Sequence, residues 1–469
     1  MDFNSLKRYF DYNFIKAAEK WRRRNSYYYA DILRFLKYAI FQPSKVLQVG
    51  ADDGWILSRL QPAEGVFLGL SQAGILEGRR KFHNLRFIED EQINSLPLTE
   101  RFDYVLLINT IGSVDDLLPY FARLHQIVKP SSRVIITYYN YLWEPIIKLG
   151  EILGLKQRQP IQNWLSIGDV ANLLELSGFE VVKEGRRMLL PKYLPLLSEI
   201  FNEFLAKLPF FNRFCFWQYT IARPKDLQTI HKEYSVSVVV PARNERGNIE
   251  EIVRRVPEMG HGTELVFVEG GSTDGTWEEI LRVKERYPQK KIIATRQDGR
   301  GKGDAVRKGF SLARGDILMI LDADLTVAPE DLPRFYRIIA SNKAEYVHGS
   351  RLVYPMEKGA MRFLNLLGNK FFSMVFSWLL KERIKDTLCG TKVLFRKDYE
   401  KIAANRRYFG DFDPFGDFDL IFGASKLSLK LAELPVHYHE RKYGRTNISR
   451  FRHGWLLLKM CLFAFRKLE

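Results

Sequence analysis

The sequence has few cysteines and no long apolar run. Its three cysteines, Cys215, Cys389 and Cys461, are widely spaced and form no metal-like pair. This argues against a disulfide framework and predicts a reducing, cytoplasmic compartment. No stretch of about 18 uncharged apolar residues occurs, so we expect no transmembrane helix. The first twelve residues are polar, so we expect no secretory signal peptide either.

Length and charge narrow the function classes. A chain of 469 residues exceeds one ordinary hydrophobic core, so at least two domains are expected. Lys and Arg number 72 against 55 Asp and Glu, a formal net charge of +17. Such an excess favours anionic partners, namely phosphates, an acidic membrane surface or nucleic acid. Zinc spacings, RNA-binding signatures and basic helix-turn-helix patterns are absent from the sequence, so we expect no nucleic-acid partner.

Three segments combine aromatic and basic residues, at positions 16–40, 362–385 and 448–467. An amphipathic helix with Trp, Phe and Leu on one face and Lys or Arg on the other can lie in a membrane interface. Alternatively, each apolar stripe packs on the core of its own domain. Together with the net charge, the segments predict peripheral attachment to the inner face of the membrane.

Two carboxylates follow an apolar strand in the second half. Residues 317–321 are apolar without alternation, which is typical of a buried parallel strand. Asp322 and Asp324 follow it, and residues two apart on an extended chain face the same side. Ligands bind at the carboxyl ends of such strands, and two carboxylates with diphosphate oxygens can hold Mg²⁺ or Mn²⁺. An isolated Asp-x-Asp, however, is more often a solvated turn.

Three strand-turn-helix units precede this strand, at residues 235–253, 264–281 and 290–315. Their turns are rich in Gly, Ser, Asp and Asn, and the strand ends should meet at one edge of a parallel sheet. These motifs resemble family 2 glycosyltransferases, which have the GT-A fold. The resemblance implies nucleotide-sugar binding by Pro241, Ala242, Asn244, Glu245, Glu269, Gly271, Ser272, Lys302, Gly303, Asp322 and Ala323, and metal binding by Asp322 and Asp324. Glu269 and Gly270 replace two aspartates of the family pattern.

Within that family, the second half is most similar to dolichyl- or polyprenyl-phosphate sugar transferases. Arg351, Arg362 and Asn369 match polar positions of this subgroup, and Asp386, Gly390 and Lys392 match its D-x-x-x-G-x-[RK] pattern. The segment ERKYGRT, residues 440–446, resembles R-x-Y-G-x-S-K, with Asn447 in place of the lysine. The resemblance implies an acceptor-phosphate site of Arg351, Arg362, Arg441 and Tyr443.

The resemblance also implies inverting sugar transfer. Asp324 and Arg351 are the expected catalytic residues, with Lys302 offsetting charge on the departing diphosphate. A phosphate acceptor is already largely ionised near neutrality and needs no strong base. A hydroxyl acceptor would need one, for which Asp419 is the first candidate. The donor remains open between UDP- and GDP-sugars, as do the sugar and the oligomeric state.

The first half also alternates strands and helices, from residue 45 to 224, and Ser166 and Asp169 form an expected capping box. This order resembles class I S-adenosylmethionine-dependent methyltransferases. Their glycine loop is matched only at Gly50 and Gly54, because Gln48 and Asp52 replace its acid and its middle glycine. We therefore expect a degenerate, scaffolding domain, with an active S-adenosylmethionine site and a bifunctional enzyme as the alternative.

The predicted organisation is two α/β domains. It comprises basic amphipathic helices at 1–43, a methyltransferase-like domain at 44–222, a linker at 223–234 and a GT-A domain at 235–469. The predicted function is metal-dependent transfer of a sugar from a UDP- or GDP-sugar to a polyprenyl-phosphate-type acceptor. The alternative is transfer to a hydroxyl in polysaccharide or glycolipid synthesis.

Overall fold

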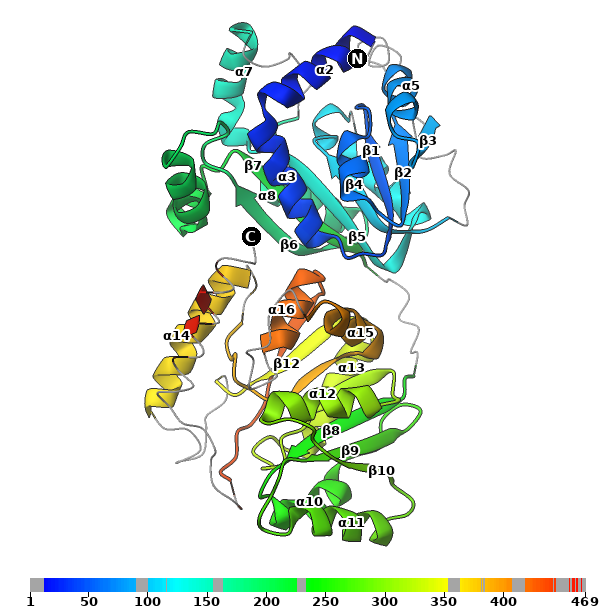
Figure 1. Ribbon diagram of the computed structural model, residues 1–469, viewed down its shortest axis with the longest axis vertical. Helices are drawn as coiled ribbons and strands as arrows, with labels where there is room; N and C mark the ends of the chain where they lie inside the picture. The colour runs from blue at the N-terminus through cyan, green and yellow to red at the C-terminus, as the bar shows by residue number, and fades with distance from the viewer. Residues whose placement is uncertain are drawn as a thin grey trace. The chain divides into compact units, whose positions relative to one another are not determined.

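A computed structural model describes residues 12–89, 100–114, 116–154, 163–225, 233–352, 363–380, 382, 384–406, 418–441 and 443, and six residues between 455 and 465. For residues 12–17, 363–367 and 418 it describes the backbone alone. The chain forms two compact units, Met1–Leu227 (unit 1) and Gln228–Glu469 (unit 2). Each contains a β-sheet covered by helices (Figure 1), which confirms the predicted α/β fold class.

The sheet of unit 1 has the order β3-β2-β1-β4-β5-β7-β6 in its described residues. Strand β7 is antiparallel to β5 and β6, and the other pairs are parallel. The strands are β1 Lys45–Gly50, β2 Glu64–Gly69, β3 Arg86–Glu89, β4 Phe102–Ile108, β5 Val128–Tyr139, β6 Phe179–Arg187 and β7 Trp217–Pro224. The helices are α2 Tyr12–Arg24, α3 Ser26–Ala39, α4 Trp55–Leu60, α5 Gln72–Lys81, α6 Leu117–Arg123, α7 Glu144–Ile152, α8 Ile167–Leu176 and α9 Pro209–Asn212. The capping box expected at Ser166 and Asp169 opens α8.

Helix α3 belongs to the core of unit 1. Its residues Ile32, Phe35 and Leu36 are buried, and the Phe35 ring lies 4.3 Å from that of Tyr219 on β7. Asp31 accepts a bond from Arg187 Nη2 at 2.8 Å and another from Trp217 Nε1 at 3.1 Å. The expectation that this segment lies in a membrane interface is therefore wrong for α3, because its apolar face is covered by its own sheet.

The sheet of unit 2 has the order β10-β9-β8-β11-β13-β12-β14 in its described residues. Strand β13 is antiparallel to β11 and β12, and the remaining pairs are parallel. The strands are β8 Val236–Ala242, β9 Thr263–Glu269, β10 Lys291–Arg296, β11 Ile317–Ile320, β12 Tyr346–Ser350, β13 Lys392–Phe395 and β14 Leu431–Pro435. The helices are α10 Arg246–Arg255, α11 Thr276–Arg286, α12 Lys302–Leu312, α13 Leu332–Ala340, α14 Phe363–Leu380, α15 Arg396–Ala404 and α16 Phe418–Lys426.

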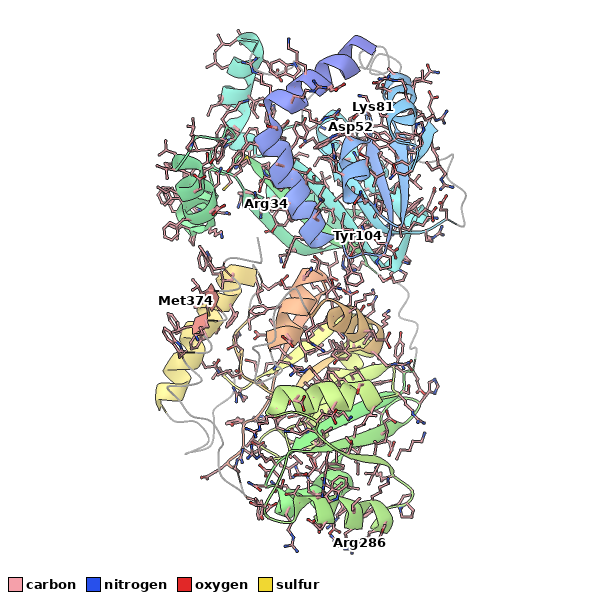
Figure 2. All side chains as sticks on the ribbon, in the orientation of Figure 1. Arg34, Asp52, Lys81, Tyr104, Arg286 and Met374 are labelled. Atoms are coloured by element: carbon pink, nitrogen blue, oxygen red, sulfur yellow. The ribbon has the colours of Figure 1, made fainter. Side chains whose placement is uncertain are left out.

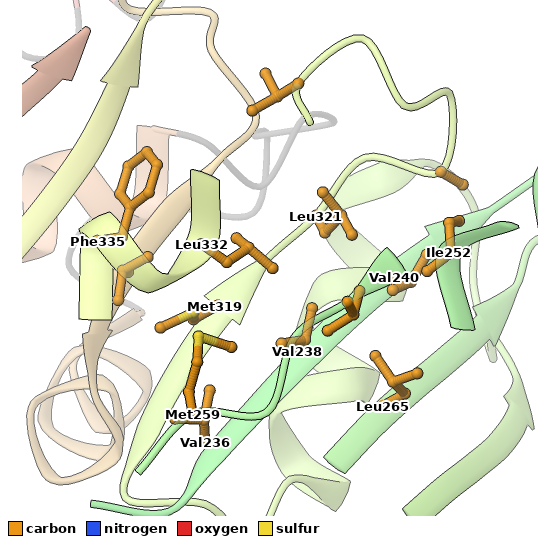
Figure 3. Packing of buried hydrophobic residues seen from close by; sticks show 14 of the residues in the cluster. Val236, Val238, Val240, Ile252, Met259, Leu265, Met319, Leu321, Leu332 and Phe335 are labelled. Carbon is orange, nitrogen blue, oxygen red and sulfur yellow. The ribbon is translucent and has the colours of Figure 1, made fainter. Parts of the chain in front are cut away.

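A continuous apolar core supports the central strands of unit 2. Val238, Val240 and Met319 lie on neighbouring strands β8 and β11, and Leu332 and Phe335 of α13 pack on the same cluster (Figure 3). All five side chains are buried. This packing fixes the strand ends from which the polar loops of unit 2 emerge.

Helix α14 buries one side and exposes another. Phe372 and Phe376 are buried, whereas Phe371 and Met374 are exposed. Figure 2 labels Met374 on the outer side of the helix. Across the part of the chain that is described, no helix has both the length and the apolar composition required to cross a bilayer.

Candidate functional site

The polar loops of unit 2 gather at one edge of its sheet. Strands β8, β9, β10 and β11 are parallel, so the turns after them share this edge. Strand pairing brings the residues after β12 and β14 and those before β13 to the same edge. Residues spread from 241 to 441 therefore meet there, as expected for the ligand-binding edge of an open α/β sheet.

The turns after β8 and β9 are bonded to each other. The Asn244 amide donates to Ser272 Oγ at 2.9 Å, and the Thr273 amide donates to Asn244 Oδ1 at 2.9 Å. Asn244 has a φ of 56° and Gly271 a φ of 71°, a region that glycine and asparagine enter most readily. Glu269 accepts a bond from the Ser272 amide at 2.5 Å, so its longer side chain closes its own turn. Pro241 and Ala242 end β8 beside Val268 and Glu269 of β9.

Asp322 forms an ion pair with the first residue of α12. Gly301, with a φ of 86°, precedes the helix, and Lys302 Nζ lies 2.5 Å from Asp322 Oδ1. Burial alone would raise the pKa of Asp322, but the charge and hydrogen bond of Lys302 hold this pKa below its ordinary value. A Cβ on Gly390 would lie 2.0 Å from Asp322 Oδ2 and 2.5 Å from Lys302 Nζ. A side chain at this position would therefore displace the pair. Gly303 and Ala323 are buried beside it.

Arg441 joins the motif after β8 to the motif after β11. Its Nη2 lies 2.6 Å from Asp324 Oδ2, and its Nη1 lies 3.0 Å from Glu245 Oε1. The other Asp324 oxygen accepts bonds from the Thr326 amide at 3.2 Å and from Thr326 Oγ1 at 2.8 Å. Burial raises the pKa of Glu245 to about 7, although the Arg441 charge acts in the opposite direction. Four predicted site residues, Asp322, Asp324, Glu245 and Lys302, thus lie with Arg441 at this edge.

Arg351 is bonded to a buried carboxylate. Its Nε and Nη2 lie 2.7 and 2.9 Å from the two oxygens of Asp386, and its guanidinium lies 5.0 Å from the ring centre of Tyr438. Asn369 Nδ2 donates to Asp386 Oδ1 at 2.8 Å. Burial would raise the pKa of Asp386, but Arg351 lowers it well below the ordinary range. Arg351, predicted to bind the acceptor phosphate, here holds the segment before β13 against the end of β12.

Three further residues of the predicted site are Tyr443, Asp419 and Arg362. Tyr443 packs over Gly247, where an added Cβ would lie 2.7 Å from its ring, and its hydroxyl donates to Asp274 Oδ2 at 3.2 Å. Asp419 lies 3.5 Å from Arg307 Nη1 and 3.6 Å from Arg406 Nε, between α12 and the end of α15. Arg362 lies outside the described residues.

Sequence reasoning missed Thr326, which orients Asp324. The pattern Asp324-Leu325-Thr326 carried a signal for it, because an aspartate often accepts a bond from the amide two residues later. Leu325, with a φ of 53°, completes this turn. The two aspartates are thus held by a local turn and by two cations.

The carboxylates of unit 2 fit a hard divalent cation. Asp322 and Asp324 offer oxygen ligands, which Mg²⁺ and Mn²⁺ prefer. Within the described ranges, no group of three or more His, Cys, Asp or Glu side chains could hold a metal by itself. The pair suits a cation whose remaining ligands come from a diphosphate and water.

The glycine loop of unit 1 is bonded to protein groups. Arg22 of α2 donates to both oxygens of Asp53, at 2.7 and 3.0 Å, and Lys81 of α5 lies 3.3 Å from the same carboxylate. Gln48 Oε1 accepts from the Leu57 amide at 3.0 Å. Asp52 Oδ1 accepts from the Gly54 amide at 2.8 Å. Burial, with a smaller effect of Asp53, raises the pKa of Asp52 to about 6.

The same loop is closely packed by helix α5. A Cβ on Gly74 would lie 2.4 Å from the carbonyl oxygen of Asp52, so α5 contacts the loop backbone (Figure 2 labels Asp52 and Lys81). Asn109, which follows β4, donates from Nδ2 to the Tyr28 hydroxyl of α3 at 3.0 Å. The methyltransferase resemblance also implies an acidic residue that binds the ribose hydroxyls directly after β2, where this chain has Leu70. Gly50 and Gly54 are present, but Leu70 offers no side-chain acceptor and Asp52 adds an acid to the loop. These residues do not fit S-adenosylmethionine.

Comparison with known proteins agrees with both halves. Residues 237–402 match the family described as Glycosyl transferase family 2, and residues 21–184 match a Methyltransferase domain family. A dolichol-phosphate mannosyltransferase of Pyrococcus furiosus is 34% identical over 48% of this chain and 64% of its own length. A dolichyl-phosphate beta-glucosyltransferase of Saccharomyces cerevisiae is 29% identical over 45% of this chain and 68% of its own length.

A third relative is the hexosyltransferase Agl6 of low-salt glycan biosynthesis in Haloferax volcanii. It is 28% identical over 49% of this chain, which spans 53% of the relative. The chain thus spans between about half and two thirds of the length of these relatives. Unit 2 carries a family 2 glycosyltransferase domain, and unit 1 carries a methyltransferase-like domain.

Proposed function

We propose that the chain is a metal-dependent, inverting glycosyltransferase. It moves a sugar from a UDP- or GDP-sugar to a polyprenyl-phosphate-type lipid at the inner face of a membrane. The observation that carries the proposal is the bridge from Glu245 through Arg441 to Asp324, which joins two motifs expected to bind one nucleotide-sugar. The relatives named for dolichol-phosphate transfer support the acceptor class.

The cations of the site suit a departing diphosphate. Lys302 and Arg441 each carry a charge already placed beside a carboxylate of the pair. When a diphosphate is present, both side chains can donate to its oxygens and stabilise the charge that develops on it. A divalent cation held by Asp322 and Asp324 would supply further charge compensation there.

The acceptor attacks the anomeric carbon from the face opposite the diphosphate. A phosphate monoester is largely ionised near neutrality, because its second pKa is about 6. No general base is then needed. The described members of the predicted acceptor-phosphate site are Arg351, Arg441 and Tyr443. Asp419, between Arg307 and Arg406, stays a predicted base for a hydroxyl acceptor.

A transfer screen tests the proposal. UDP- and GDP-sugars are combined with Mn²⁺ or Mg²⁺ and a short polyprenyl phosphate, a matched alcohol or no acceptor. We expect transfer to the phosphate, abolished in Asp324→Ala. Glu258→Ala is the matched control, since Glu258 is an exposed carboxylate paired with Lys290 and precedes β9 at the opposite edge of the sheet. Hydrolysis without lipid transfer would redirect the acceptor to a hydroxyl, and no activity with any donor would refute the proposal.

A further inference from the structure

An extended apolar surface lies on unit 1, formed by residues outside the three segments that the sequence predicts to be interfacial. It consists of exposed side chains in two stretches, residues 141–153 and 193–214, and is called the apolar platform below. Its members are Tyr141, Leu142, Ile146, Leu149, Ile152, Leu153, Tyr193, Leu194, Leu196, Leu197, Ile200, Phe204, Phe210, Phe211 and Phe214. Ile152 is 81% exposed and Leu196 78%.

The two stretches are neighbours in space. Asn140 Nδ2 donates to the Arg213 carbonyl at 2.9 Å, and Trp143 Nε1 donates to the Phe214 carbonyl at 2.8 Å. The first stretch follows β5, and the second connects β6 to β7, so both leave the sheet of unit 1 at one edge. Figure 1 shows α7 and the helical turns around residues 199–212 on the same side of unit 1. The two stretches are therefore joined to each other at this edge and lie on one side of unit 1.

The platform is large for a soluble surface. Fifteen large apolar side chains, each from a third to four fifths exposed, present an area on the order of 1,000 Å². The largest apolar patch on a typical monomer is roughly 300–600 Å², and larger patches mark binding surfaces. Leaving such an area in water is unfavourable, so an apolar partner should cover it.

The border of the platform is net positive. Lys192 Nζ donates to the Arg24 carbonyl at 2.9 Å, which brings the end of α2 with Arg23 and Arg24 to its edge. Residues 141–153 and 189–214 contain four cations, Lys148, Lys192, Lys207 and Arg213, against four glutamates. Helix α2 adds Arg23 and Arg24, of which Arg23 is bonded to Glu19 at 2.8 Å. One of the four glutamates, Glu144, is bonded to Lys148 at 2.6 Å. An apolar centre with cations at its margin is the pattern of an interfacial membrane contact.

We infer that unit 1 docks on an anionic lipid bilayer through the apolar platform. The apolar side chains enter the boundary between headgroups and acyl chains, while Arg24, Lys192 and Arg213 meet the headgroup phosphates. The formal net charge of the whole chain, +17, also favours binding to an acidic membrane surface. This inference concerns unit 1 and does not rest on sugar transfer by unit 2.

Vesicle binding of the full chain tests the inference. The variant Ile152→Glu/Leu196→Glu/Phe210→Glu places three charges in the platform. The control Leu76→Glu/Leu281→Glu changes exposed leucines elsewhere, 61% and 39% exposed on α5 and α11. All proteins are first compared by thermal melting, which should match because the altered side chains are exposed.

Co-sedimentation uses vesicles of phosphatidylcholine with phosphatidylglycerol. We expect the platform variant to partition at least about tenfold less than wild type, because apolar contact area sets interfacial affinity, and the control to bind like wild type. Equal binding of the platform variant, or equal loss in the control, would overturn the inference.

A fluorescent reporter identifies what covers the platform. Leu196→Cys and Leu76→Cys are each labelled with an environment-sensitive dye. The native cysteines Cys215, Cys389 and Cys461 are buried, which favours labelling of the introduced thiol. We expect a blue shift on vesicle addition at position 196 and none at 76. A shift at 196 without lipid that grows with protein concentration would assign the platform to contact between copies and refute membrane docking, as would no shift.

Discussion

Replacing Gly390 with alanine should lower the transfer activity of unit 2 about 100-fold with little loss of stability. The added Cβ would lie 2.0 Å from Asp322 Oδ2 and 2.5 Å from Lys302 Nζ, whereas real Cβ contacts are essentially never below 3.0 Å. The carboxylate and the ammonium group must therefore move by roughly 1 Å, and a misplacement of that size can cost about 100-fold in rate. Both groups are side-chain ends and can shift without disturbing the core.

The measurements are kcat/KM for the donor and the melting temperature. We expect Gly390→Ala to lose about 100-fold in kcat/KM and to melt close to wild type. Gly368→Ala is the matched control, because its added Cβ meets nothing within 4 Å on helix α14. Alanine in a helix interior is more stable than glycine by roughly 0.5–1 kcal/mol, so the control should be active and no less stable. A fully active Gly390→Ala enzyme would show that the geometry of the Lys302–Asp322 pair is irrelevant to transfer.

Three further outcomes follow from buried charges. Arg351→Ala should lower the free energy of unfolding by about 3–5 kcal/mol, because it leaves the Asp386 carboxylate buried without its cation; Arg351→Ala/Asp386→Asn should recover part of the loss in urea denaturation. The raised pKa of Glu245, about 7 against an ordinary 4.5, stabilises the fold below pH 4.5, and this contribution is lost as pH rises through 7. Between pH 5 and 8 the free energy of unfolding should therefore fall more for wild type than for Glu245→Gln, which has no carboxyl group to ionise. Parallel plots of the free energy of unfolding against pH for the two proteins would contradict the raised pKa of Glu245. Calorimetry of the full chain with S-adenosylmethionine should show no binding heat, because Asp53 in the glycine loop of unit 1 is bonded to Arg22. Measurable binding would refute the conclusion that this loop does not fit S-adenosylmethionine.

Local patterns explain what the sequence predicted correctly. The apolar run before Asp322 and the Gly- and Ser-rich turn after Glu269 are features of a few consecutive residues, and parallel strands bring their ends to one edge whatever the loop lengths. The capping box at Ser166 is likewise local. These patterns sufficed for the fold class and for placing Asp322, Asp324, Glu245 and Lys302 at one edge of the sheet.

Contacts between distant residues explain what the sequence did not reveal. Arg441 lies 117 residues after Asp324, and Arg22 lies 31 residues before Asp53. No local sequence pattern predicts either bond over such separations. The amphipathic pattern of α3 is the same whether its apolar face meets a bilayer or a sheet. The apolar platform escaped notice because its two stretches are separated in sequence and contain glutamates.

The bonds of Asp31 determine when unit 1 can finish folding during synthesis. Its partners Arg187 and Trp217 lie 156 and 186 residues later in the chain. At roughly 5–20 residues per second, the apolar face of α3 waits on the order of 10–40 s before β7 is synthesised. During that interval Ile32, Phe35 and Leu36 lack their final partners, and contacts of such long sequence separation form slowly. Unit 1 therefore depends on late closure between its first helices and its last strand, and a nascent chain stalled before Trp217 would present that apolar helix to chaperones.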